Sequence, residues 1–192
     1  MTTYLERLTE AMSLIARDSR SIFIGQSIVA GGTAMTQTFI DVPISKKIEF
    51  PVAEDLQLGL SIGLSLTDNL PITIFPRINF MMCCISQLVL HLDALPLYSE
   101  FRPKIIIRTA IPTSVPLDPG PQHLDPTSDN PVWNGVGLSM NGVSGYLHPD
   151  GYIAALRTML RTVVVDEITR AADVLPIYRA ALARPLSTIL VE

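Results

Sequence analysis

The stretch IEFPVAEDLQLGLSIGLSL, residues 48–66, reads as a short strand, a proline turn and an apolar helix. Proline has no N–H to donate to a strand ladder, so we expect Pro51 to separate a strand at Ile48–Phe50 from a helix at Ala53–Leu66. Glu54 then lies in the first turn of that helix. Because ligands bind at the carboxyl ends of strands in sheets flanked by helices, this carboxylate is placed for chemistry. The alternative is that Glu54 only stabilises the helix N-terminus, by about 0.3–1 kcal/mol.

The composition describes a chain with a large apolar content and few charges. Of its 192 residues, 48% are hydrophobic and 17% are charged, whereas charged residues make up about 25% of an average chain. This length fits one domain over residues 1–192, and the low charge predicts a large buried interface. The net charge of −4 offers no basic surface to the phosphates of a nucleic acid, so we expect no nucleic-acid partner.

Cysteine usage and the N-terminus point to an intracellular protein. Cys83 and Cys84 are adjacent in an apolar helical run, so they are interpreted as reduced packing residues rather than a disulfide framework. The opening MTTYLERLTEAM lacks the basic start and apolar centre of a signal peptide. No apolar run reaches the roughly 18 residues of a membrane span. We therefore expect a cytoplasmic protein that does not enter a membrane.

Apolar runs and amphipathic stretches alternate along the chain. The predicted strands lie at 22–24, 48–50, 71–75, 104–108, 162–165 and 187–191, and the predicted helices at 4–17, 53–66, 79–95 and 150–161, with a last helix ending near residue 183. This alternation predicts parallel strands joined by right-handed crossovers. We therefore predict a single three-layer α/β domain, with a mainly parallel sheet of about six strands flanked by helices.

Two further features of the chain suggest contacts beyond an ordinary core. Gly59 and Gly63 lie four residues apart in the predicted helix, and each glycine costs about 1 kcal/mol relative to alanine. They indicate either a tight contact within the domain or a contact with another subunit. The segment 109–149 is rich in proline and glycine and has little periodicity, which is typical of a functional loop, here interpreted as an ordered lid.

Several common catalytic motifs are missing from the sequence. It has neither the phosphate loop G-x-x-x-x-G-K-[ST] nor G-x-G-x-x-G after a strand, so ordinary nucleotide binding has no support. It also lacks C-x-x-C, H-E-x-x-H and G-x-S-x-G, and its three histidines are widely dispersed. No metal site is predicted within this chain.

The order and spacing of several pieces nevertheless carry a resemblance over nearly the full length. These pieces are TYLERLTEAM with SIFIGQ, FPVAEDLQLGLSIGLSL, INFMMCCISQLV, PKIIIRTAIP with GPQH, and RTVVVDEITRAADV with STILVE. Together they resemble the transketolase-like pyrimidine-binding domain of thiamine-diphosphate enzymes, specifically the β subunit of pyruvate and branched-chain 2-oxo-acid dehydrogenases. The resemblance implies the thiamine-diphosphate-binding fold.

The resemblance also implies roles for individual residues. Glu54 would hydrogen-bond the ring nitrogen of the cofactor's aminopyrimidine and favour the imino tautomer that deprotonates the thiazolium C2. Phe80 would stack on the pyrimidine, and Cys83 occupies a neighbouring cofactor-binding position. His123 would be an acid/base or intermediate-stabilising group. The alternatives are core packing for Phe80 and a solvated loop side chain for His123.

The departures from the family pattern concern the other half of the cofactor. The family holds the diphosphate and Mg²⁺ with a Gly-Asp-Gly…Asn motif on another domain, and this chain has only Asp150-Gly151. An α-like partner subunit is therefore expected to hold the diphosphate and Mg²⁺. We expect the family's C-terminal domain to be lacking. Gln26 replaces a usual acidic residue and Cys83 a usual polar one, and residues 124–149 resemble an insertion that would act as a lid or set substrate choice.

The resulting expectation is the pyrimidine-binding subunit of a thiamine-diphosphate-dependent 2-oxo-acid dehydrogenase or decarboxylase. It would act on a small 2-oxo acid only when assembled with its partner, as a heterotetramer in which the Gly59/Gly63 helix supports self-association. One alternative is a split transketolase-like or non-oxidative decarboxylase subunit. Another is a non-catalytic scaffold subunit that keeps the fold without turnover.

Overall fold

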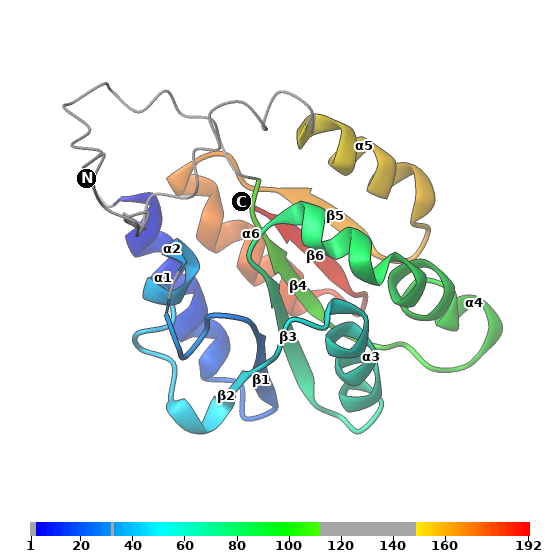
Figure 1. Ribbon diagram of the computed structural model, residues 1–192, viewed down its shortest axis with the longest axis horizontal. Helices are drawn as coiled ribbons and strands as arrows, with labels where there is room; N and C mark the ends of the chain where they lie inside the picture. The colour runs from blue at the N-terminus through cyan, green and yellow to red at the C-terminus, as the bar shows by residue number, and fades with distance from the viewer. Residues whose placement is uncertain (1–2, 32, 112–148) are drawn as a thin grey trace, which may run out of the picture.

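Six parallel strands form the centre of the molecule (Figure 1). The computed structural model describes residues 3–31, 33–111 and 149–192. Its strands are β1 (Ser21–Gly25), β2 (Lys47–Glu49), β3 (Leu70–Phe75), β4 (Ile106–Thr109), β5 (Val164–Glu167) and β6 (Thr188–Val191). They lie in the order β2-β1-β3-β4-β6-β5, and every neighbouring pair is parallel. The prediction of an α/β fold with about six strands is confirmed, and the sheet is parallel throughout.

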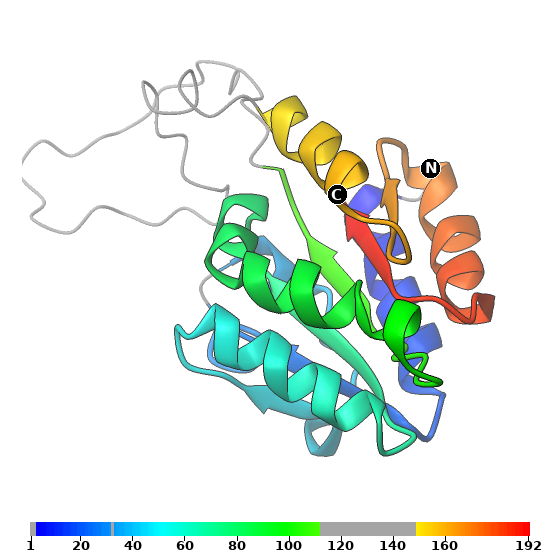
Figure 2. The same ribbon diagram turned by 90° about the vertical axis from the view of Figure 1, so that its right-hand side faces the viewer.

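Helices cover both faces of this sheet, as Figure 2 shows from the side. The helices on one face are α1 (Tyr4–Ala16) and α6 (Ala171–Ala183), and those on the other are α3 (Glu54–Ser65), η2 (Ile78–Cys84), η3 (Gln87–Leu92), α4 (Leu95–Tyr98) and α5 (Pro149–Met159). We call these the α1/α6 face and the α3 face. Each face has its own cluster of buried apolar side chains, so the domain has three layers.

The local sequence explains why these elements form. All six residues of β3, LPITIF, are buried, as expected for a central strand of a parallel sheet covered on both faces. The helix α1 begins with a capping box, in which the Thr3 hydroxyl accepts from the Glu6 N–H and the Glu6 carboxylate accepts from the Thr3 N–H. This confirms the predicted start of the first helix.

The segment after β3 differs from the prediction of one regular helix at 79–95. The structure has a 3₁₀ helix at η2, a π-type turn at η3 and a short α-helix at α4. In the π-type turn the Asp93 N–H donates to the Leu88 carbonyl 2.9 Å away, five residues back. Among the described residues no single helix is long and apolar enough to cross a membrane, although Ile78–Cys84 and Gln87–Tyr98, bent by 70°, would pass that test together.

The buried carboxylate of Asp93 explains why β5 begins two residues later than predicted. It accepts hydrogen bonds of 2.7–3.1 Å from the backbone N–H groups of Arg161, Thr162 and Val163. These three N–H groups are therefore not available to the sheet, whose ladder starts with the Val164 N–H donating to the Ser187 carbonyl. Smaller differences are the short helices α2 (Ala34–Gln37) and η1 (Ile44–Lys46) in the predicted loop 26–47.

A charged network lies buried on the α1/α6 face. Arg108 of β4 is fully buried and donates to both carboxylate oxygens of Glu192 at 2.8 Å. Its third contact is a 2.6 Å hydrogen bond to the Thr38 hydroxyl, and the Tyr178 hydroxyl donates to the same Glu192 carboxylate. Burial alone would lower the pKa of Arg108, but the charges of Glu192 and Tyr178 and the hydrogen bond to Glu192 together outweigh it and raise that pKa. The network is fully paired within the chain.

Candidate functional site

The strand order places a topological switch point between β1 and β3. The connection after β1 covers the α1/α6 face, where Ile28, Phe39 and Val42 join the core, whereas the connection after β3 covers the α3 face. Chains that leave two adjacent strands toward opposite faces separate at the carboxyl edge of the sheet, and ligands of α/β proteins bind there. The residues that follow β1 and β3 therefore line the candidate site.

Glu54 contributes the carboxylate at this site. It is the first residue of α3, and only 8% of its surface is exposed. The side-chain amide of Gln26, the residue after β1, donates to Glu54 Oε1 over 3.2 Å. Among the described residues, Oε2 has no hydrogen-bond donor. The structure thus places the predicted catalytic carboxylate of Glu54 beside Gln26, which the sequence identified only as a departure from the family pattern.

Gln57 lies one turn further along α3 and is completely buried. Its amide N–H₂ donates to the Thr73 hydroxyl at 2.9 Å and to the Ile74 carbonyl at 3.0 Å, which fastens the start of α3 to β3. Its Oε1 has no partner among the described residues, and neither does the hydroxyl of Thr109 at the end of β4. Buried polar atoms are normally paired, so these two atoms on the α3 face are exceptions among the described residues.

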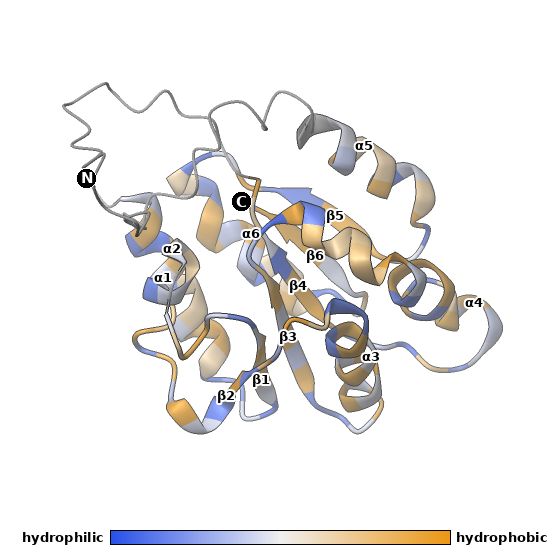
Figure 3. Ribbon diagram, viewed as in Figure 1, coloured by the Kyte–Doolittle hydropathy of each residue, from blue (hydrophilic) through white to orange (hydrophobic). Residues whose placement is uncertain are grey.

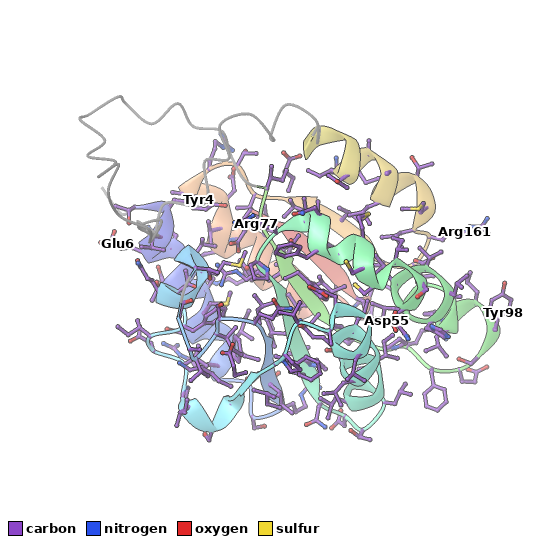
Figure 4. All side chains as sticks on the ribbon, in the orientation of Figure 1. Tyr4, Glu6, Asp55, Arg77, Tyr98 and Arg161 are labelled. Atoms are coloured by element: carbon purple, nitrogen blue, oxygen red, sulfur yellow. The ribbon has the colours of Figure 1, made fainter. Side chains whose placement is uncertain are left out.

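Phe80 and Arg77 come from the segment directly after β3. Phe80 is half-buried in η2, and the Arg77 guanidinium carbon lies 5.8 Å from the centre of its ring. Figure 4 labels Arg77 near the carboxyl ends of the central strands and Asp55 in the first turn of α3. The partly open ring leaves Phe80 available for contact with a ligand, while the predicted stacking itself stays a prediction.

The two adjacent cysteines have different environments. Cys83 is exposed, whereas Cys84 is buried beneath α3. Burial, followed by the negative charges of Asp55 and Glu54, raises the pKa of the Cys84 thiol to about 12. The predicted packing role holds for Cys84 and is wrong for Cys83, which is open to solvent, and the reduced state of both stays a prediction. A cofactor contact of Cys83 stays a prediction.

Glu49 was missed by the sequence analysis. Its carboxylate, at the end of β2, accepts hydrogen bonds from the four consecutive backbone N–H groups of Ser27, Ile28, Val29 and Ala30, over 2.6–3.2 Å. Burial alone would raise the pKa of Glu49, but these N–H donors outweigh it and lower that pKa. A glutamate at a strand end gives no sequence signal for such a contact, since its partners lie about twenty residues earlier.

Other predicted features of the site fall outside this geometry. His123 and the part of the proposed insertion from residue 124 to 148 lie outside the described residues, while Pro149 begins α5. Among the residues that the structure describes, no three His, Cys, Asp or Glu side chains are grouped to hold a metal ion. A side chain at Gly59 would meet Gln87 at an ordinary 3.6 Å, and one at Gly63 would meet nothing within 4 Å. Neither glycine is required for packing against the described part of the chain.

Comparisons with known proteins concern the fold. No family model matches the sequence, and no curated protein matches it. A split-gene transketolase, described as an inactive β4 tetramer, matches with a TM-score of 0.63 and 13% identity over 98% of this chain. Benzoylformate decarboxylase from Polynucleobacter necessarius matches with a TM-score of 0.53 and 14% identity, also over 98%. The chain has the fold of a transketolase-like pyrimidine-binding domain.

This fold corresponds to only part of each matching protein. The chain spans 50% of the transketolase chain and 32% of the decarboxylase chain. Both names belong to enzyme classes that the sequence resemblance had suggested, and the predicted thiamine-diphosphate-binding fold is confirmed. At 13% and 14% identity the likeness supports the fold and not a particular activity.

Proposed function

We propose that the chain is the pyrimidine-binding, β-like subunit of a thiamine-diphosphate-dependent 2-oxo-acid dehydrogenase or decarboxylase, active only with a diphosphate-binding α-like subunit. The observation that carries the proposal is the Glu54 carboxylate, which is 8% exposed and is hydrogen-bonded to the residue after β1, at the switch point between β1 and β3. A buried carboxylate at such a position is expected to serve a ligand rather than solvent.

The described residues fit the pyrimidine half of thiamine diphosphate. Glu54 Oε1 accepts a hydrogen bond from Gln26, which leaves Oε2 for a ring nitrogen of the cofactor. Phe80, whose ring is half-buried, lies in the segment directly after the neighbouring strand β3. They do not fit the diphosphate and Mg²⁺, because the described part of the chain groups no acidic side chains for a cation. The partner subunit would hold these groups.

Each residue would have a limited task in the reaction. When bound, thiamine diphosphate supplies the nucleophilic carbon that attacks a 2-oxo acid. Glu54 Oε2 would hold or give up a proton at the pyrimidine nitrogen, and its burial would strengthen that hydrogen bond. Phe80 would orient the ring by stacking. His123 would exchange protons with the substrate, and Cys83 would line the pocket beside Phe80.

The surface of the α3 face supports assembly with other subunits. Leu56 and Leu60 on α3 are 62% and 39% exposed, and Leu90 on η3 is 67% exposed. Figure 3 shows that hydrophobic residues are frequent along these helices. Exposed apolar side chains that gather on one face mark interaction sites. We propose that this face, including Gly59 and Gly63, contacts the α-like partner or a second copy of the chain.

A split transketolase-like subunit is the second candidate. The likeness over 98% of this chain to a protein named as a split-gene transketolase supports it. The two proposals share the role of Glu54 and differ in the substrate. Turnover of pyruvate and branched 2-oxo acids, compared with turnover of sugar phosphates, separates them.

The deciding experiment is calorimetric titration of thiamine diphosphate with Mg²⁺ into the chain alone and into the chain assembled with a Gly-Asp-Gly…Asn subunit. We expect binding by the assembled pair only. In the pair, Glu54→Gln should lower 2-oxo-acid decarboxylation by about 10²–10⁴-fold, the usual size of an acid/base contribution. The exposed Glu100→Gln is the matched control and should keep full activity. Unchanged turnover in Glu54→Gln would contradict the assignment.

A further inference from the structure

We infer that Glu49 and Gln26 form a positioning relay that fixes the Glu54 carboxylate, so that Oε1 is occupied and Oε2 faces the ligand. The contacts that build the relay are independent of the ligand's identity. The ligand itself, an aminopyrimidine ring, rests on the proposed function. Gln26 and Glu49 are positioning residues in this scheme, because they act through Glu54.

The relay begins with the loop after β1. Four consecutive N–H groups, those of residues 27–30, point at the one carboxylate of Glu49, over 2.6, 3.0, 2.7 and 3.2 Å. Hydrogen bonds to a charged acceptor are about twice as strong as neutral ones. Ser27 has a φ of 57°, in the left-handed region, which turns the backbone so that its successive N–H groups converge. Glu49 thereby holds the loop in one conformation.

A close backbone contact fixes the other side of Gln26. A Cβ on Gly25 would lie 2.6 Å from the Ile74 carbonyl oxygen and 2.9 Å from the Ile74 Cβ, which is too close for any side chain. The backbone of Gly25 therefore packs directly against Ile74 of β3. Gln26 lies between this contact and the Glu49-bound loop, so its backbone has little freedom to move.

Gln26 transmits this restraint to Glu54. A carboxylate can only accept hydrogen bonds, so the amide nitrogen of Gln26 is the end that faces Oε1, at 3.2 Å. Among the described residues Gln26 is the donor that reaches the Glu54 carboxylate. Losing it would free the carboxylate to rotate and would expose either oxygen to a ligand. The hydrogen bond from Gln26 therefore decides which Glu54 oxygen faces the ligand.

The first test measures the relay in the free chain by nuclear magnetic resonance. The Gln26 side-chain N–H₂ signals, assigned by their loss in Gln26→Met, should shift in Glu54→Gln and also in Glu49→Gln. The signals of Gln37, which is exposed on α2, should not move. Unmoved Gln26 signals in Glu54→Gln would overturn the relay. Circular dichroism checks that each variant folds, and Glu49→Asp replaces Glu49→Gln if the latter does not.

The second test uses thiamine diphosphate and Mg²⁺ with the assembled pair. Gln26→Met should weaken cofactor binding about tenfold, the value of one hydrogen bond. The double variant Gln26→Met/Glu54→Gln should bind no more weakly than Glu54→Gln, because Gln26 acts only through Glu54. Additive losses would overturn the positioning role, and Gln37→Met is the control. If the unmodified pair binds no cofactor, the proposed function fails while the resonance test still decides the relay.

Discussion

The two faces of the sheet treat their buried polar groups differently. On the α1/α6 face, Arg108, Glu192 and Tyr178 pair with one another in the interior. On the α3 face, Glu54 has one described donor and the completely buried Gln57 keeps an oxygen without a partner among the described residues. The Thr188 hydroxyl on the first face also lacks a described partner, but it is uncharged and lies at the amino end of β6.

Exposed apolar side chains occur on both sides of the sheet, and those in the connection after β1 include Ile40 at 78% and Ile44 at 67% exposure. The outer surface of the α3 face carries Leu56 at 62% and Leu90 at 67% exposure. The two faces therefore differ in their buried charged groups: the Arg108–Glu192 pair is satisfied within the chain, whereas Glu54 and Gln57 keep spare acceptors for a further donor. This difference favours the α3 face for the candidate ligand site, and the proposed subunit contact on the same face stays a proposal.

The largest expected effect tests whether the buried Arg108–Glu192 ion pair stabilises the α1/α6 face. Arg108→Met would leave the Glu192 carboxylate buried without its cation, and breaking a buried ion pair costs about 3–5 kcal/mol. Urea unfolding should show this loss in the free energy of unfolding. Arg170→Met, in an exposed pair with Asp173, is the matched control and should cost less than about 1 kcal/mol. Similar losses in both variants would mean that the buried network is not what holds this face.

A smaller effect is expected from the alkaline titration of the same face. Burial, followed by the Glu192 charge, raises the pKa of Tyr178 well above its ordinary value of 10.0. The folded chain therefore keeps the phenol proton after the unfolded chain has lost it, so stability is full below pH 10 and falls as pH rises further. Each such group contributes about 1.4 kcal/mol per pH unit in that range.

Urea unfolding between pH 8 and 11 measures this fall, with Tyr178→Phe for comparison. Above pH 10 the free energy of unfolding should fall less steeply in Tyr178→Phe than in the unmodified chain. Burial also raises the pKa of Tyr4, but Tyr4 is present in both proteins, so the difference between their slopes reports Tyr178. Equal slopes for the two proteins would contradict the buried, protonated state of Tyr178.

The smallest change in the free energy of unfolding is expected from a substitution on α3 that should nevertheless weaken subunit association. Leu56→Asp adds a charge to an exposed position of α3, so it should alter the free energy of unfolding by less than about 0.5 kcal/mol. Sedimentation should nevertheless show weaker association with the α-like partner or with a second copy. Leu5→Asp, at a 40% exposed position of α1, should leave association unchanged. If Leu5→Asp and Leu56→Asp behave alike, the two faces do not differ in assembly.

Sequence patterns predicted the parts of the fold that depend on local periodicity. The apolar runs at β3 and β4 and the amphipathic stretch of α1 identify their elements because burial acts on neighbouring residues. Position in the fold was also predictable for Glu54, since Pro51 marks the passage from strand to helix. These signals were sufficient for the three-layer architecture.

Contacts between distant residues escaped prediction. The start of β5 is set by Asp93, which lies about seventy residues earlier and takes the N–H groups that a ladder would use. Gln26 and Glu54 are 28 residues apart, and Arg108 and Glu192 are 84 apart. The arginine in the apolar run KIIIR was a signal of a buried partner, but nothing in the sequence identified which carboxylate it would be.

The contrast between the neighbouring thiols has a practical consequence. Burial raises the pKa of the Cys84 thiol to about 12, so very little of it is thiolate at neutral pH, whereas Cys83 is open to solvent. A thiol-reactive dye will therefore attach to one position of the unmodified chain. That position lies in η2, three residues after Phe80, so the dye's emission can follow events at the carboxyl edge of the sheet in real time.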